Sequence, residues 1–115
     1  MSSQPKSLQD RFAALQAAFL QQTRERMTDI EQRWPAVRSS LSPQELKPIY
    51  IHVHSLCGSS STLGFAEISE AAMQADLFLR PLANADESIP AACIPQIESL
   101  LETLRLAAAQ SVMPG

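Results

Sequence analysis

The sequence predicts an all-α domain, an antiparallel up-down four-helix bundle, and three observations support this fold class. Apolar residues recur every three or four positions, which places them on one face of an α-helix. No stretch alternates apolar and polar residues over a strand length, and no Asn-Gly or Asp-Gly hairpin turn occurs. Four helical segments with short connections are typical of such a bundle.

The size and composition are those of one folded domain spanning residues 1–115. Hydrophobic residues make up 45% of the 115 residues and charged residues 18%, which is enough for one core. The net charge of −3 lacks the basic excess of nucleic-acid-binding proteins, so nucleic acid is not an expected partner. We expect residues 1–6 and 111–115 to be flexible ends.

The first predicted helix runs from about residue 7 to residue 33. Because Pro35 disfavours helical geometry in the residue before it, we expect the helix to stop or kink at Trp34. The apolar stripe that defines this helix consists of Leu8, Phe12, Leu15, Phe19, Thr23, Met27, Ile30 and Trp34.

The second predicted helix has two possible starts. The Ser-Pro-Gln-Glu segment at 42–45 has the form of a capping box with proline at the first helical position. Pro48 instead allows a short turn there and a helix that begins later. In both cases the helix continues to about Leu63, and Gly64 suits its C-terminal cap.

Two further helices complete the predicted bundle. The third spans about residues 65–79, and Pro81 with the polar stretch 84–88 is expected to end it. The fourth begins between Pro90 and Pro95 and continues to about Gln110.

Cysteine content and hydropathy predict a cytoplasmic protein. Cys57 and Cys93 are its two cysteines and do not form a disulfide framework. No uncharged apolar run approaches the roughly 20 residues of a membrane span. The first ten residues lack a basic region followed by an apolar one, so we expect no signal peptide.

The segment 52–64 contains both histidines and both internal glycines, and it carries most of the chemical information. At about 100° per residue, Val53 and Leu56 fall on the apolar side of the second helix, whereas His54 points to the opposite side, toward solvent. The residues that share the outer face with His54 are Tyr50, Cys57, Gly58 and Ser61.

The two histidines do not form a metal site in this interpretation. His52 lies almost opposite His54, and metal ligands on one helix face need spacings of three or four residues. His54 and Cys57 share a face, but two ligands make a poor zinc site. We expect His52 to be a packed or border residue with a hydrogen-bonded ring nitrogen, and we expect no bound metal.

An exposed glycine in mid-helix costs about 1 kcal/mol relative to alanine. Gly58 is explained either by close approach of another molecule to His54 or by simple tolerance near a helix end. A neutral imidazole nitrogen can attack a phosphoryl group. Because the sequence has no GxxxxGK loop, such a group would come from another protein.

The segment from His54 to Phe65 resembles the signature of histidine-containing phosphotransfer (Hpt) domains: a histidine, any residue, Leu or Ile, Lys, Gly, small residues, a turn glycine and an apolar residue. The resemblance covers residues 53–65 and extends weakly to Asp76. It implies a four-helix bundle that relays phosphoryl groups between receiver-domain aspartates in multistep two-component signalling.

By position, the resemblance implies that His54 accepts the phosphoryl group on the ring nitrogen remote from the backbone. It implies that Gly58 leaves room for the receiver's loops, that Leu56 and Leu63 belong to the core, and that Asp76 orients the histidine.

One position departs from the signature. Hpt domains usually have lysine three residues after the histidine, and this chain has Cys57, a weak S–H donor. Losing one exposed charge contact would cost on the order of 1 kcal/mol. Cys57 is interpreted as a spacer, with a redox switch as the alternative. Lys47 shares the face of His54 two turns away and is expected to meet an acidic receiver surface.

The resemblance implies a monomeric phosphocarrier that is not an enzyme and has no cofactor of its own. Its expected partners are response-regulator receiver domains, which would carry the Mg²⁺, with a hybrid sensor kinase as a further candidate. Two alternatives stay open. The missing lysine favours a docking module that transfers little phosphate. An unrelated helical dimerisation domain would bury the stripe from Leu8 to Trp34 against a second copy.

Overall fold

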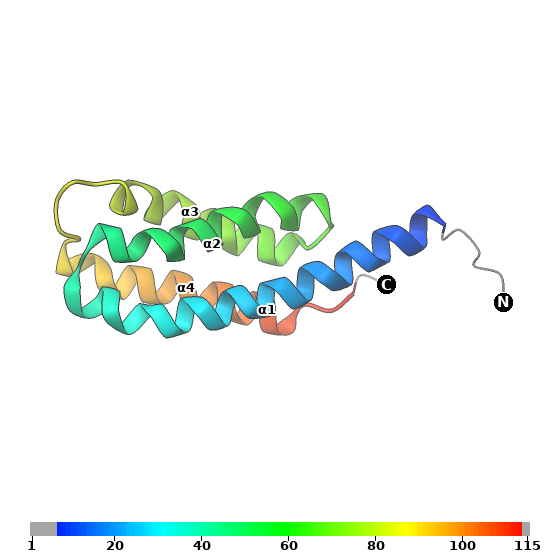
Figure 1. Cartoon of the computed structure of the whole chain (residues 1–115), viewed down its shortest axis with the longest axis horizontal. Coiled ribbons are helices and arrows are strands. Elements are labelled where there is room, and N and C mark those ends of the chain that lie inside the picture. The colour runs from blue at the N-terminus through cyan, green and yellow to red at the C-terminus, as the bar shows by residue number, and fades with distance from the viewer. Residues whose placement is uncertain (1–6, 114–115) are drawn as a thin grey trace.

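The computed structural model describes residues 7–113 and contains four long helices packed side by side (Figure 1). Helix α1 spans Leu8–Ser40, α2 Pro43–Thr62, α3 Ala66–Ala83 and α4 Ile94–Gln110, and a short 3-10 helix, η1 at Ala91–Cys93, precedes α4. Each long helix packs on its neighbour in sequence, and α4 also packs on α1. No strand occurs in this part of the chain. The predicted all-α four-helix bundle is confirmed.

All four helices contribute to one apolar core. The loop before η1 also contributes, because Ile89 is buried and its N–H donates to the carbonyl of Leu41 at 2.8 Å. Within residues 7–113, no helix is long and apolar enough to cross a membrane. The largest fully buried apolar side chains are Ile30, Leu46, Ile49, Leu56, Ile68, Leu79, Ile89, Ile97 and Leu104.

Helix α1 continues through Pro35 to Ser40, so of the two expected outcomes at Trp34, a stop or a kink, the stop is wrong. Proline removes the hydrogen bond to the carbonyl four residues earlier, but that residue, Glu31, is exposed and water can bond it. Beyond the proline, Val37 is completely buried. Burial of the last turns therefore outweighs the local preference of proline.

The predicted stripe of α1 is only partly buried. Phe19, Met27 and Ile30 belong to the core as expected. Leu8 and Leu15 are 81% and 59% exposed, and Phe12 is also exposed, because the first turns of α1 project beyond the bundle (Figure 1). The spacing of these residues predicts that they share one helix face, but it does not reveal whether another helix lies opposite that face.

Helix α2 begins at Pro43, which confirms the earlier of the two predicted starts. The Ser42 hydroxyl accepts a hydrogen bond from the N–H of Glu45, and Pro48 lies inside the helix.

Helix α2 ends where Gly64 was expected to cap it. Gly64 has a φ of +85°, its N–H donates to Ser61, and the N–H of Phe65 donates to the carbonyl of Ser60 at 2.9 Å. This pair of bonds is a Schellman motif, which uses the left-handed conformation that glycine adopts without strain.

Helix α3 extends past Pro81 to Ala83, so the expected end near Leu79 is wrong. The carbonyl that Pro81 leaves free belongs to exposed Leu77, whereas Ala83 is buried. Helix α4 begins and ends within the predicted limits. The expected flexible end at 1–6 lies outside the described residues, as do residues 114 and 115.

Candidate functional site around His54

The side chain of His54 projects from α2 into solvent beside α3. It is 61% exposed, while its helix neighbours Val53 and Leu56 are completely or almost completely buried. The apolar side of α2 thus faces the core, and the imidazole faces outward, as the helical wheel predicts.

A buried carboxylate holds one ring nitrogen of His54. Nδ1 lies 3.1 Å from Oδ1 of Asp76, a side chain of α3 that is only 5% exposed. Because a carboxylate only accepts hydrogen bonds, Nδ1 carries the proton. In the neutral ring, Nε2 then holds the lone pair, and no hydrogen bond to it occurs within residues 7–113.

Arg80 completes this arrangement, and the sequence analysis missed it. Its Nη2 donates to Oδ2 of Asp76, and its Nε donates to the hydroxyl of Tyr50 at 3.2 Å. These hydrogen bonds raise the pKa of Arg80 above its usual value, and the bond to Tyr50 contributes more than the bond to Asp76. The signal in the sequence was the spacing of four between Asp76 and Arg80, which puts an acid and a base on one helix face.

Tyr50 lies one turn before His54 on α2 and is half-buried. Its ring centroid is 5.8 Å from that of His54, with the two ring planes inclined by 30°. Tyr50, His54, Asp76 and Arg80 therefore form one connected polar layer between α2 and α3. We call these four side chains the histidine layer.

Cys57 borders the histidine layer but is turned partly inward, since it is half-buried against the core. Burial raises the pKa of its thiol, as does the negative charge of Asp76, while Arg80 opposes this effect. The thiol is thus held in its less reactive, protonated form, which favours the spacer interpretation over a redox switch.

Gly58 lies on the exposed surface of α2, one turn after His54. A Cβ atom built there would meet nothing within 4 Å. No group of the chain itself therefore requires glycine at this position, and the surface at Gly58 is open to another molecule.

The other predicted site residues lie farther from His54. Ser61 is exposed in the last turn of α2, near Gly64, and the two help to line a shallow surface depression with Ala66 and Ser69. Lys47 donates a hydrogen bond to the side chain of Asn84, which directly follows the C-terminal end of α3. Neither Ser61 nor Lys47 is hydrogen-bonded to the histidine layer.

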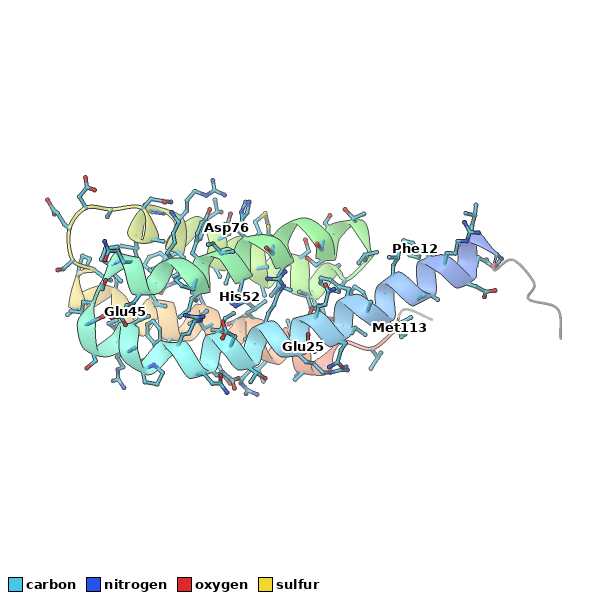
Figure 2. All side chains as sticks on the ribbon, in the orientation of Figure 1. Phe12, Glu25, Glu45, His52, Asp76 and Met113 are labelled. Atoms are coloured by element: carbon cyan, nitrogen blue, oxygen red, sulfur yellow. The ribbon has the colours of Figure 1, made fainter. Side chains whose placement is uncertain are left out.

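His52 is the border residue that the sequence predicts. Figure 2 shows it on the side of α2 that faces α1, away from Asp76. Its Nδ1 lies 3.0 Å from a guanidinium nitrogen of Arg26, and its Nε2 lies 2.6 Å from Asp29. Hydrogen bonds from Arg33 and His52 lower the pKa of Asp29, and the bond from Arg33 has the larger effect. Both ring nitrogens of His52 are therefore engaged, and residues 7–113 contain no cluster of three or more metal-binding side chains.

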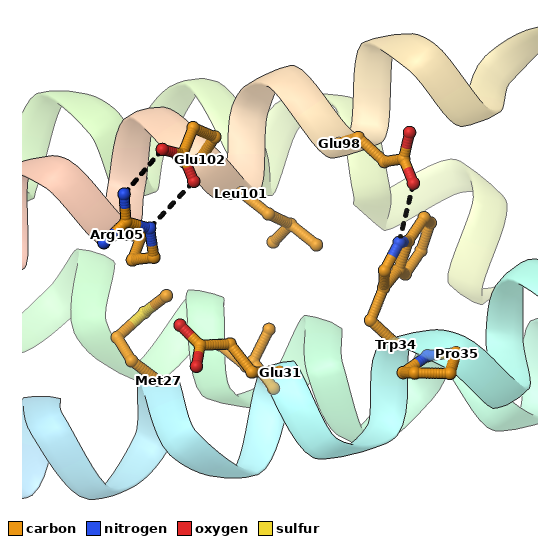
Figure 3. A pocket seen from close by; sticks show the side chains of 9 residues that line it. Met27, Glu31, Trp34, Pro35, Glu98, Leu101, Glu102 and Arg105 are labelled. Carbon is orange, nitrogen blue, oxygen red and sulfur yellow. Dashed lines mark hydrogen bonds and ion pairs between the residues drawn. The ribbon is translucent and has the colours of Figure 1, made fainter.

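A separate hollow of about 380 Å³ lies between α1 and α4 (Figure 3). Met27, Ile30 and Leu101 contribute apolar walls, and the indole of Trp34 donates to Glu98 at 3.0 Å. None of the residues that line it belongs to the histidine layer.

Comparison with known proteins identifies the family. The family model of the Hpt domain matches residues 14–107, which include all of α2 and α3, most of α1 and α4, and the complete histidine layer. No curated protein matches the chain, and no solved structure does. The chain therefore belongs to the Hpt domain family, whose members are phosphocarrier modules that transfer phosphoryl groups through histidine in phosphorelays.

Proposed function

We propose that His54 accepts a phosphoryl group from the aspartyl phosphate of a receiver domain and passes it to an aspartate of another receiver. The observation that carries this proposal is the pairing of an exposed Nε2 with an Nδ1 bound to a buried carboxylate. His52 does not offer this combination, because both its nitrogens have protein partners.

The transfer step follows from the tautomer. The lone pair of Nε2 attacks the phosphorus in line, the N–P bond forms, and the P–O bond to the aspartate breaks, so that its carboxylate leaves with the electron pair. The imidazole becomes a cation that keeps its proton on Nδ1, next to the carboxylate of Asp76. A charged hydrogen bond there is stronger than the neutral one it replaces, which favours the phosphorylated state.

Arg80 is the positively charged side chain of the histidine layer. Cys57 stands where Hpt domains usually have lysine, so this contact is missing. Arg80 is half-exposed and bound to Asp76, and it thereby brings a guanidinium to the histidine layer. We expect the receiver to provide Mg²⁺ and most of the charge stabilisation in the transition state, so that this chain needs no cofactor.

Labelling tests the proposal. A receiver domain carrying radioactive aspartyl phosphate is mixed with the chain, and the chain is analysed for label that is lost in acid and kept in alkali. We expect the wild type and His52→Gln to become labelled and His54→Gln to stay unlabelled. Circular dichroism checks that both variants are folded.

Two results contradict the proposal. Equal labelling of His54→Gln and wild type would exclude His54 as the acceptor. Tight binding of a phosphorylated receiver without any label on the wild type would favour the docking module, the alternative motivated by Cys57.

A further inference from the structure

The first two turns of α1 have no partner in the bundle. Residues 8–15 are helical, and every one of them is exposed. Gln16 is the first buried residue, and its side chain donates to the carbonyl of Leu63 at 2.9 Å. Figure 1 shows this part of α1 extending beyond the turn between α2 and α3. We call residues 8–15 the α1 overhang.

The α1 overhang carries large apolar side chains in a regular seam. Leu8, Phe12 and Leu15 are 81%, 42% and 59% exposed. Their spacing of four and three continues to Phe19, which is buried and stacks on Phe65. Alternating spacings of four and three place side chains along the line where two helices pack together. The core stripe of α1 thus continues past the point where its own bundle ends.

The end of the bundle adds to this apolar surface. Val112 and Met113 follow α4 and are 75% and 38% exposed. Figure 2 shows Met113 and Phe12 at the same end of the molecule. The exposed fractions of these five residues add up to about three fully exposed apolar residues per copy, a surface on the order of several hundred Å². This is as large as the largest apolar patch on a typical monomer, about 300–600 Å², and such patches often mark an interaction surface.

We propose that the α1 overhang pairs with the same segment of a second copy of this chain, in antiparallel orientation. The seam is nearly symmetric about Phe12, with Leu8 four residues before it and Leu15 three residues after it. A two-fold axis near Phe12 sets Leu8 against the partner's Leu15 and Phe12 against the partner's Phe12. Such self-complementarity is what an isologous interface requires.

The geometry of the chain favours the antiparallel arrangement. The two bundles then point away from each other, and the tip of each overhang reaches the end of the partner's bundle, where Val112 and Met113 are exposed. Because the paired segments are short, the buried area would lie at or below the lower limit of specific interfaces, about 1,200 Å². Interfaces of this size are typical of weak association, so we expect a dimer that forms between micromolar and millimolar concentration.

Sedimentation velocity from low micromolar to near-millimolar concentration measures this association. We expect the wild type to shift from monomer to dimer. Leu15→Glu and, separately, Leu8→Glu would stay monomeric, because each places a carboxylate in the seam. Leu77→Glu is the matched control, since Leu77 is 60% exposed but lies on α3, and this variant should dimerise like the wild type. All substituted side chains are exposed, so melting temperatures should change little.

The shape of the dimer provides a second readout. One chain is 59 Å long, so an antiparallel pair overlapping by about 12 Å would extend about 100 Å in solution scattering. A wild type that stays monomeric near millimolar concentration would overturn the proposal and leave the overhang for a different partner. Dimerisation of Leu15→Glu equal to that of wild type, or a compact side-by-side dimer, would overturn it as well. The labelling of His54 is expected to be the same in Leu15→Glu, so the two proposals can fail independently.

Discussion

At the scale of single residues, the chemistry depends on how Asp76 holds His54. Asp76 does not touch the phosphoryl group in this account. It is a positioning residue, which fixes the proton on Nδ1 and leaves Nε2 facing solvent. The neighbouring Arg80 and Tyr50 hold Asp76 in turn.

Asp76→Asn tests this positioning role. Its amide oxygen can still accept a hydrogen bond from Nδ1, but it lacks the negative charge that stabilises the phosphorylated ring. A hydrogen bond to a charged group is worth about 1.5–3 kcal/mol and a neutral one about 0.5–1.5 kcal/mol, so the lost charge should cost about 1 kcal/mol and slow phosphoryl transfer to His54 about fivefold. Rapid-quench kinetics with a labelled receiver measure the rate. Arg80→Ala, which keeps the carboxylate, should lose less. A rate in Asp76→Asn equal to that of wild type would rule out the role of Asp76.

Cys57 offers the second prediction at this scale. Cys57→Lys restores the residue that Hpt domains usually have, and its long side chain can pass from the half-buried position to solvent. One added charge contact of about 1 kcal/mol should lengthen the lifetime of phosphorylated His54 about fivefold. Loss of radioactive label from the purified phosphoprotein gives this lifetime, with Cys57→Ala as the control. A lifetime in Cys57→Lys no longer than in Cys57→Ala would contradict the charge argument.

At the scale of the helices, the sequence predicted those helix ends that are formed by hydrogen bonds between residues close together in the chain. The serine cap at Ser42 and the glycine turn at Gly64 were readable because their hydrogen bonds join residues that are close in sequence. The helix ends predicted from Pro35 and Pro81 were wrong, because each proline is followed by a residue that the helix buries, Val37 and Ala83. Whether burial outweighs a lost hydrogen bond depends on tertiary packing, which no local rule contains.

The two internal glycines should respond to alanine in opposite directions. Gly58→Ala adds a methyl group in open space on α2 and should stabilise the fold by about 0.5–1 kcal/mol. Gly64→Ala forces a side chain into the left-handed conformation and should destabilise it by about 1–2 kcal/mol. Urea unfolding measures both free energies. Destabilisation by Gly58→Ala would mean that this position serves the fold of the chain itself.

At the scale of the whole molecule, the proposed phosphoryl-transfer site and the proposed dimerisation surface lie in different places. The histidine layer lies between α2 and α3, and the α1 overhang lies beyond the end of the bundle. The fold class and the outward orientation of His54 were predictable, because both follow from helical periodicity. The contact between Asp76 and His54 could not be derived from periodicity, because it depends on the register between α2 and α3, and only the resemblance to Hpt domains implied it. The contact between Asp76 and Arg80 was open to prediction from their spacing of four on α3. The exposure of Leu8 and Leu15 was not predicted, because periodicity shows which residues share a helix face but not whether another helix packs against it.

Nuclear magnetic resonance of ¹⁵N-histidine-labelled protein tests the central claim most directly. Before phosphorylation, we expect the proton of neutral His54 on Nδ1. After incubation with a phosphorylated receiver, phosphorus should be coupled to Nε2 of His54, while the signals of His52 keep their pattern. Phosphorus on Nδ1 of His54, on His52 or on neither ring would contradict the account.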